Sequence, residues 1–128
     1  MTLLEFKDWA LAQGSVAKFN DGRYKGECVS LINQYCWRVL GVPAGSWGHA
    51  IDWASNANVL NHFKKVSDVQ PGDILVFGSP YAKYVENGKT KYYGHVQIAL
   101  AGGKVLDQNG SGTGKISVRA PFSGAIAI

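Results

Sequence analysis

Helical sequence patterns occupy the first half of the chain, and strand patterns occupy the second half. The helical patterns cover residues 3–13, 28–40 and 49–57. The strand patterns cover residues 73–77, 92–100, 104–107 and 116–119. Because the two kinds of element are segregated along the chain, the order predicts an α+β fold, with the N-terminal helices packed on one side of an antiparallel sheet.

Local residue patterns indicate where several of these elements begin and end. Thr2 and Glu5 have the spacing of a capping box, so the first helix should begin there and end at Gly14. Gly41 should close the second helix in the left-handed conformation. Asn87-Gly88, in the polar stretch after the first strand, predicts the tip of a hairpin.

The length of the chain and its two cysteines predict one domain without a disulfide. A chain of 128 residues, taken as a single domain over 1–128, is long enough to bury a core of its own. Cys28 and Cys36 fall on the same predicted helix, where their Cα atoms would lie about 12 Å apart. A disulfide needs a separation below about 7 Å. We therefore expect two free thiols, with Cys36 in the core.

Cys28 has the sequence setting of a reactive residue, because it begins the second predicted helix directly after a glycine-rich loop. The free N–H groups and the macrodipole of a first helical turn favour a thiolate over a thiol. His95 lies on a predicted strand, and Asp107 and Asn109 end the next one, on one face if that strand continues. This is the chain order of papain-like nucleophilic enzymes. Taken alone, Cys28 and His95 fit equally well as a small buried residue and a hydrogen-bonded core histidine.

Five segments, in order, resemble the CHAP family, the cysteine- and histidine-dependent amidohydrolases and peptidases of bacterial cell walls. They are residues 20–29, 48–54, 71–77, 94–99 and 107–109, so the resemblance covers nearly the whole chain. It implies a papain-like α+β fold and a peptidoglycan hydrolase that acts through a cysteine acyl-enzyme. The bond cut would be the muramoyl–L-alanine amide or a peptide bond of the stem or cross-bridge, and the sequence leaves both open.

The resemblance also implies a role for each site residue. Cys28 would attack the carbonyl, His95 would activate the thiol and protonate the leaving amine, and Asp107 with Asn109 would orient the imidazole. The backbone N–H of Cys28 and a neighbour would hold the oxyanion. Glu27 departs from the family, in which many members carry glutamine at this position. We expect Glu27 to cap the helix or to pair with a nearby basic side chain.

No metal ion or cofactor is expected. Some family members bind calcium in the loop before the cysteine through alternating acidic residues. Asp21 matches part of that loop, but Phe19 stands where a further acid is expected, and Arg23 and Lys25 add positive charge. Calcium at this loop is the one alternative, since the histidines and cysteines lack the paired spacing of a zinc site.

Aromatic side chains are the candidates for contact with the substrate, because they combine flat apolar faces with polar edges. Trp47 lies in a glycine-rich loop, and Tyr93 directly precedes the Gly94-His95 pair. We expect Trp47 and Tyr93 to line a groove for the glycan and stem peptide. Trp53 is better explained as a core residue.

Charge and the N-terminal sequence bear on the partner and the place of action. The formal net charge of +4 suggests an acidic partner, and the absence of a long Lys/Arg run favours the bacterial wall over nucleic acid. Glu5, Lys7 and Asp8 interrupt any secretory signal, and no run approaches the ~20 apolar residues of a membrane helix. We expect action on peptidoglycan after release by a phage holin, or export within a larger protein that carries further wall-binding domains.

Two other functions fit part of the sequence. An NlpC-type cysteine wall peptidase would share the first strand and the histidine, but it typically needs a third histidine, and none follows His95. A non-catalytic wall-binding module would explain the basic, aromatic-rich composition. It would not explain the placement of Cys28, His95 and Asn109.

Overall fold

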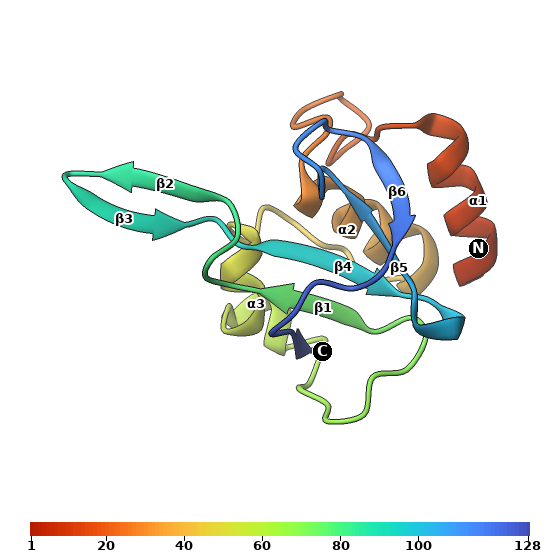
Figure 1. Cartoon of the computed structure of the whole chain (residues 1–128). Helices are drawn as coiled ribbons and strands as arrows, with labels where there is room; N and C mark the ends of the chain where they lie inside the picture. The colour runs from red at the N-terminus through yellow and green to blue at the C-terminus, as the bar shows by residue number, and fades with distance from the viewer.

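The computed structural model describes all of residues 1–128, with the helices before most of the strands along the chain (Figure 1). The helical elements are α1 (Leu3–Gln13), α2 (Cys28–Tyr35), the π-helical turn η1 (Cys36–Leu40), the 3₁₀ turn η2 (Ala50–Ala54), α3 (Ala57–Leu60) and the 3₁₀ turn η3 (Ala101–Gly103). The strands are β1 (Ile74–Phe77), β2 (Lys83–Glu86), β3 (Lys89–Tyr92), β4 (His95–Ala99), β5 (Val105–Gln108), β6 (Ile116–Arg119) and β7 (Ile126–Ala127). The predicted α+β class is confirmed.

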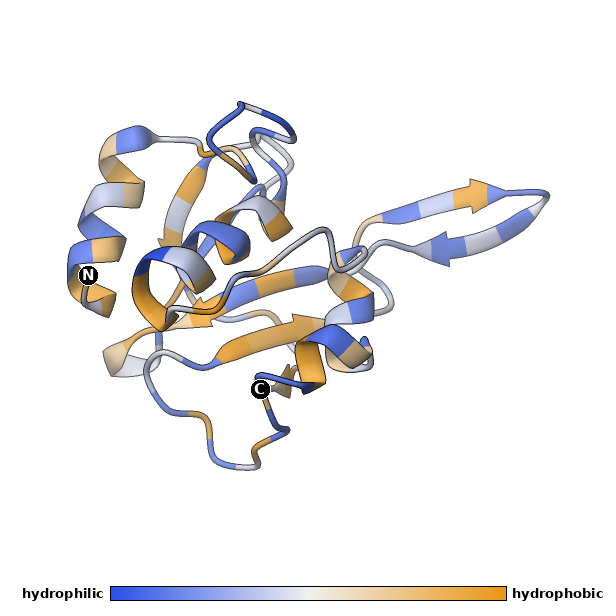
Figure 2. Cartoon of the chain, turned by 180° about the vertical axis from the view of Figure 1, so that it is seen from behind, coloured by the Kyte–Doolittle hydropathy of each residue, from blue (hydrophilic) through white to orange (hydrophobic).

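Five strands form one antiparallel sheet in the order β6-β5-β4-β1-β7. Phe77 pairs with His95 at one end of the β1–β4 ladder, and Asp107 pairs with Ser117 in the β5–β6 ladder. Views from the two sides place α2 and the η2–α3 segment against one face of the sheet (Figures 1 and 2). The sheet therefore has one helix-covered face and one face without helices.

The two faces of the sheet carry different side chains, because successive residues of a strand alternate. The helix-covered face contributes apolar side chains to the main core, among them Ile74, Val76, Val96, Ile98 and Leu106. The other face holds a smaller apolar cluster of Leu75, Phe77, Val105 and Ala127. By the same alternation, His95 and Gln97 lie on this second face. β1 contributes to both clusters, which explains why it is apolar along its whole length (Figure 2).

The predicted ends of the first two helices are confirmed. The Thr2 hydroxyl accepts a hydrogen bond from the Glu5 N–H, and the Glu5 carboxylate accepts one from the Thr2 N–H. Gly14 ends α1 with φ 73°, and Gly41 ends the second helical segment in the left-handed conformation with φ 66°. The longest helix, α1, has 11 residues, and no helix has the length and apolar character needed to cross a bilayer.

The later elements differ from the prediction in three places. The expected helix over 49–57 is instead η2 followed by α3, because Asn56 leaves the helical conformation and caps α3 with its side chain. The expected strand over 92–100 is interrupted at Gly94, whose φ is 76°. β7 was not predicted, since two residues that pair with β1 are too short to show a period.

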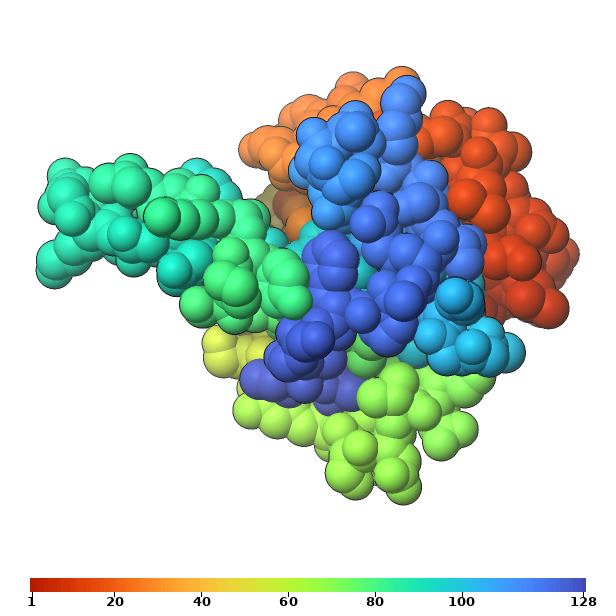
Figure 3. Space-filling view, in the orientation of Figure 1, coloured from red at the N-terminus to blue at the C-terminus, as the bar shows by residue number.

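The β2–β3 hairpin projects from the rounded body of the molecule (Figures 1 and 3). Its tip is Asn87-Gly88, and both residues have positive φ values, 51° and 75°. Positive φ at both central residues is the conformation that a tight hairpin turn requires, and Asn-Gly adopts it readily. The predicted hairpin tip is confirmed.

Candidate active site

The β4–β5 ladder opens at the end of the sheet that carries His95. Its last pair toward His95 is Ile98–Leu106, so the first residues of β4 have no partner on β5. Cys28, the first residue of α2, lies at this opening, where a hydrogen bond from the backbone N–H of Val96 to its sulfur favours the thiolate. The open ladder therefore admits the start of a helix beside the histidine.

Cys28 and His95 line the same groove, which has a volume of about 710 Å³. The groove is bounded by the loop before α2, the base of the β2–β3 hairpin and the loop after β5, and the surface is hollowed between these segments (Figure 3). Loops thus form its walls, while a helix terminus carries Cys28 and a strand carries His95. Rigid elements hold such groups more exactly than loops do.

Asp107 is a fully buried carboxylate whose two oxygens accept four hydrogen bonds. Its Oδ2 accepts from His95 Nε2 at 2.8 Å and from Gln97 Nε2 at 2.9 Å. Its Oδ1 accepts from Ser117 Oγ at 3.2 Å and from Arg119 Nε at 3.1 Å. Burial alone would raise the pKa of Asp107, but the hydrogen bonds of His95 and Gln97 and the charges of His95 and Arg119 hold it below its usual value. Asp107 is therefore an anion held rigidly behind the histidine.

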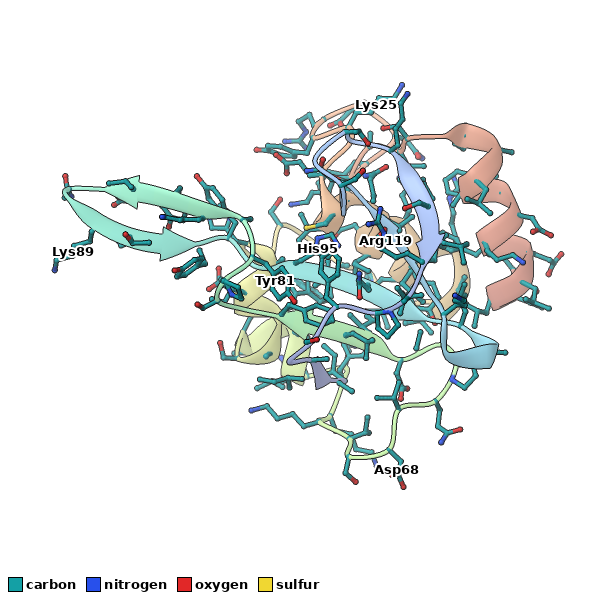
Figure 4. All side chains as sticks on the ribbon, viewed as in Figure 1. Lys25, Asp68, Tyr81, Lys89, His95 and Arg119 are labelled. Atoms are coloured by element: carbon teal, nitrogen blue, oxygen red, sulfur yellow. The ribbon has the colours of Figure 1, made fainter.

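The His95 imidazole is fixed by this carboxylate and by a neighbouring ring. Its Nε2 is bonded to Asp107, so Nδ1 is the ring nitrogen left for the groove. The Phe122 ring lies 5.0 Å from the imidazole, between centroids, and the Phe122 N–H donates to Gln97 Oε1. Figure 4 shows His95 and Arg119 near one another on the face without helices, with Tyr81 close by. Because the carboxylate accepts from Nε2, it selects the tautomer whose Nδ1 can take a proton.

Gly94 allows the backbone of another segment to lie against the start of β4. A Cβ on Gly94 would collide with the Phe77 carbonyl oxygen and with the Ile51 N–H, and its φ of 76° is also unfavourable for other residues. The space that a side chain at position 94 would need is therefore filled by the β1 backbone and the start of η2.

Burial of the Cys28 sulfur opposes the thiolate that was expected there. Burial raises the pKa of Cys28 to about 11, and the backbone N–H groups of Val96 and Val29 oppose this rise without overcoming it. The nearby negative charge of Glu27 adds to the rise. The helix terminus was expected to favour the thiolate, but at this depth the loss of water is the larger effect.

Cys36 is buried in the core, as predicted. Its side chain is completely covered in the main core, and burial raises its pKa to about 12. Both cysteines are free thiols, which agrees with their separation along the helix. Cys28 is the cysteine that reaches a groove.

Glu27 neither caps α2 through its side chain nor forms an ion pair. It occupies the N-cap position without a side-chain hydrogen bond, and the carboxylate that pairs with Arg23 is that of Asp21, at 2.6 Å. The expectation for Glu27 is therefore wrong. Its exposed carboxylate lines the groove.

Asn109 does not contact the imidazole, which corrects the expectation that it shares a face with Asp107. β5 ends at Gln108, and Asn109 turns away with φ 66°. Its side-chain oxygen instead accepts a hydrogen bond from the Gly114 N–H at 2.8 Å, so it shapes the loop at the rim of the groove. The shared face required the strand to continue through Asn109, one residue past its actual end.

The two aromatic candidates have different positions. Tyr93 lines the groove, with its ring stacked on Tyr84 at 4.0 Å and in edge contact with His49 at 4.7 Å. Trp47 does not line the groove. Its ring packs against buried Trp53 at 5.6 Å and stacks on His62 at 5.8 Å. The predicted placement is thus correct for Tyr93 and wrong for Trp47.

No group of three or more His, Cys, Asp or Glu side chains is placed to hold a metal ion. In the loop before α2, the Asp21 carboxylate accepts from both the backbone N–H and the Nε of Arg23. Both carboxylate oxygens of Asp21, the acid that matches the calcium loop, are therefore already bonded to Arg23.

Gln108, completely buried at the end of β5, holds the backbone beside Cys28 in place. Its Nε2 donates to the Glu27 carbonyl at 2.6 Å and to the Val16 carbonyl at 3.0 Å, and its Oε1 accepts from the Val16 N–H at 2.7 Å. The Glu27 carbonyl belongs to the peptide that precedes Cys28. One side chain thus ties the start of α2 and the preceding loop to the strand that carries Asp107.

Replacing Gln108 by leucine should lower both stability and turnover. The change leaves the Val16 N–H without a partner and removes one of the two hydrogen bonds that each of the Val16 and Glu27 carbonyls accepts, so the free energy of unfolding should fall by about 2–4 kcal/mol. The peptide before Cys28 also loses its anchor, so kcat should fall more than KM rises. Urea unfolding and steady-state kinetics measure the two effects, with Gln13→Leu as the control because Gln13 is exposed at the end of α1. Wild-type stability in the Gln108 variant would contradict this role of Gln108.

Sequence reasoning missed four residues of this site: Gln97, Gln108, Ser117 and Arg119. Gln97 could have been found, because it lies two residues after His95 on the same strand and therefore faces the same side. Ser117 and Arg119 required the β5–β6 register, and Gln108 required contacts with residues more than 80 positions away.

Comparisons with known proteins identify a family and a fold for this chain. The model of the family described as the CHAP domain matches residues 17–115. The crystal structure of Ly7917 superimposes with a TM-score of 0.61 at 19% sequence identity, covering 98% of this chain. The structure of Ly7917 with the hydrolysing product of MDP gives a TM-score of 0.60, also at 19% identity and 98% coverage. The chain spans 59% of the Ly7917 chain. A comparison with curated proteins found no match.

Proposed function

The chain belongs to the CHAP domain family, and we propose that it hydrolyses an amide or peptide bond of bacterial peptidoglycan with Cys28 as its nucleophile. The observation that carries this proposal is the 2.8 Å hydrogen bond that fixes His95 on buried Asp107 in the groove that Cys28 also lines. A nucleophile, a base and a group that orients the base are the parts that acyl transfer requires.

The first half of the reaction forms a thioester. As the Cys28 sulfur attacks the carbonyl carbon, its proton passes to His95 Nδ1, and the carbonyl oxygen becomes an oxyanion. The backbone N–H of Cys28 at the start of α2 stabilises that charge. When the intermediate collapses, the bond to nitrogen breaks and His95 gives its proton to the leaving amine.

The second half releases the acid product. Water attacks the thioester carbon, His95 accepts the water proton, and the thiol is restored when the carbon–sulfur bond breaks. Asp107 remains ionised throughout and stabilises the imidazolium that forms in each half. Because the pKa of Cys28 is raised to about 11, proton transfer to His95 belongs to the attack itself rather than preceding it.

Two further observations support a cell-wall substrate. The groove is lined by aromatic side chains that include Tyr81 and Tyr93, and the Tyr93 ring is backed by the stacked ring of Tyr84, which suits a chain of sugar and peptide units. Ly7917, which has the same fold, was solved with the hydrolysing product of MDP. The muramoyl–L-alanine amide and the stem or cross-bridge peptide bonds are the two candidate bonds.

Incubation of the protein with purified murein tests the proposal directly. We expect the turbidity of the suspension to fall and free amino groups to appear, without new reducing sugar ends. Mass spectrometry of the fragments would then identify the bond, because amidase cleavage frees the peptide from muramic acid and endopeptidase cleavage does not. Release of reducing ends alone would contradict an amide hydrolase.

Asp107→Asn should lower turnover, and it should also weaken the dependence of the free energy of unfolding on acidic pH. The pKa of Asp107 is below its usual value in the folded protein, so its ionisation adds stability above the unfolded pKa of about 3.9. That contribution disappears as pH falls through the folded pKa. At neutral pH the variant should lose about 3 kcal/mol, because Arg119 and His95 lose a buried anion.

The comparison with Asn109→Ala makes this prediction specific. Asn109 does not contact the imidazole, so its removal should change KM or loop order more than kcat, whereas Asp107→Asn should lower kcat by about 10²-fold or more. Urea unfolding at pH 7 and pH 3 together with steady-state kinetics measures both variants. A larger loss of kcat in Asn109→Ala would reverse the assignment.

We propose that the reaction needs no metal ion. Asp21 is engaged by Arg23, and no cluster of metal-ligating side chains lies near Cys28. EDTA should therefore leave murein lysis within about twofold of the untreated rate. Complete loss on chelation, with recovery on added calcium, would show that the loop around Asp21 binds the ion through its carbonyl groups.

A further inference from the structure

Lys18 is a buried lysine whose ammonium group forms no ion pair. Its side chain belongs to a residue that is only 7% exposed, and none of the five ion pairs of the structure includes it. Its Nζ lies over the face of the Tyr24 ring, 5.0 Å from the ring centroid. Lysine is almost never buried to this degree without a partner, so its position needs an explanation.

The backbone of Lys18 is held firmly. Its N–H donates to the Arg23 carbonyl at 2.9 Å, and the Gln34 amide reaches the carbonyl groups of both Ala17 and Lys18. Gln34 lies on α2, the helix that begins with Cys28. Lys18 is therefore tied to the same rigid element as the nucleophile.

The ammonium group lies on the side of the reactive groove. Lys18 lines that groove together with Tyr24, Cys28 and His95, and it also borders a smaller hollow beside Arg38. Tyr24, over which Nζ lies, lines the groove and not the hollow. The charged end is thus presented to the groove.

The charges around Lys18 leave it short of negative partners. Burial lowers its pKa, Glu27 opposes that effect, and Arg23 adds to it. Glu27 is exposed and does not approach within ion-pair distance. An anion bound in the groove would supply the missing charge at a point where little water competes with it.

We propose that Lys18 binds a carboxylate of the peptide part of the substrate, so that the groove prefers acidic peptides over their carboxamide forms. This inference rests on the proposed function, and it names the substrate class within it. Lys18 is then a specificity residue. Its ammonium group binds a negative charge near the scissile bond. Cys28 and His95 carry out the chemistry.

Binding in a Cys28→Ala background tests this inference without turnover. The probes are L-alanyl-γ-D-glutamyl-L-lysine with free carboxylates and the same peptide with both carboxylates converted to carboxamides. Calorimetric titration should give about tenfold tighter binding of the acid form. Lys18→Met, which keeps the length and removes the charge, should reduce that ratio to about one.

Two further variants separate charge recognition from a structural role. Lys25→Met is the matched control, because Lys25 lies in the same loop, is exposed and points outward in Figure 4. It should keep the preference for the acid form, and Lys18→Arg should keep most of it. Equal affinity for the two peptides in the Cys28→Ala protein would overturn the inference whether or not Lys18→Met folds. An unchanged preference in folded Lys18→Met would overturn it as well.

Failure of this inference is distinguishable from failure of the proposed function. Murein lysis by the unmodified protein without a preference for acid peptides would remove the role of Lys18 and leave the hydrolase intact. A clear preference without any amine release from murein would instead support an acidic-peptide site and contradict the proposed hydrolase.

Discussion

Replacing Cys28 by alanine is expected to abolish murein lysis while leaving the fold intact. No other thiol reaches the groove, so the acyl-enzyme cannot form, and the rate should fall by about 10⁴-fold or more. The side chain is half-buried at the first turn of α2, and its loss should lower the free energy of unfolding by less than about 1.5 kcal/mol. Turbidity assays and urea unfolding measure the two effects.

Cys36→Ser is the control for this experiment. Cys36 is completely buried in the main core, so a hydroxyl there should cost stability, about 1–3 kcal/mol, and should leave kcat nearly unchanged. Equal loss of lysis in the two folded variants would contradict the assignment of the nucleophile.

Alkylation of Cys28 tests its resting protonation state in the same samples. With a pKa of about 11, its labelling rate should rise about tenfold per pH unit between about pH 7 and pH 10, and Cys36 should remain protected. A plateau near neutral pH would show that a thiolate–imidazolium pair already exists before substrate binds.

A cysteine can be prepared for attack in two ways, and the raised pKa of Cys28 favours one of them. A helix terminus and an imidazolium can hold a thiolate in advance, but here burial outweighs the N–H groups of Val96 and Val29. The alternative is a thiol that loses its proton only as the sulfur attacks. The carboxylate of Asp107 supports this alternative, because it fixes the tautomer of His95 that accepts the proton at Nδ1.

The sequence was informative about His95 and Asp107 because they depend on local order. Strand alternation and the turn between β4 and β5 bring residues of adjacent strands onto one face, whatever the rest of the molecule does. The same reasoning failed for Asn109, because it assumed that β5 continues past Gln108. A single positive φ at Asn109 redirects its side chain toward Gly114.

Contacts between distant segments could not be predicted in this way. The bonds from Gln108 to Val16 and Glu27 join parts of the chain 92 and 81 residues apart, and no periodicity encodes them. Trp47 shows the same limit for surface residues, since a glycine-rich loop suggested exposure whereas its ring packs on Trp53. Local patterns therefore identify the reactive groups, and the tertiary contacts identify what positions them.

Replacing His95 by alanine is expected to reduce kcat by about 10⁴-fold or more, close to the effect of losing the nucleophile. A thiol whose pKa is about 11 has almost no thiolate at neutral pH, so it depends on a base within reach. The other three groups bonded to Asp107 are an amide, a hydroxyl and a guanidinium, and none of them is a base at neutral pH. The loss should appear in kcat more than in KM, because the imidazole acts on the transition state.

The control for His95→Ala is His62→Ala, because His62 is exposed and stacks on Trp47 outside the groove. That variant should keep nearly full turnover. Added imidazole should restore part of the activity of His95→Ala, since the cavity left beside Asp107 has the shape and the acceptor of the missing ring. Near-wild-type kcat in the His95 variant would refute the whole mechanism, because it would mean that the Cys28 thiol reacts without the base that Asp107 orients.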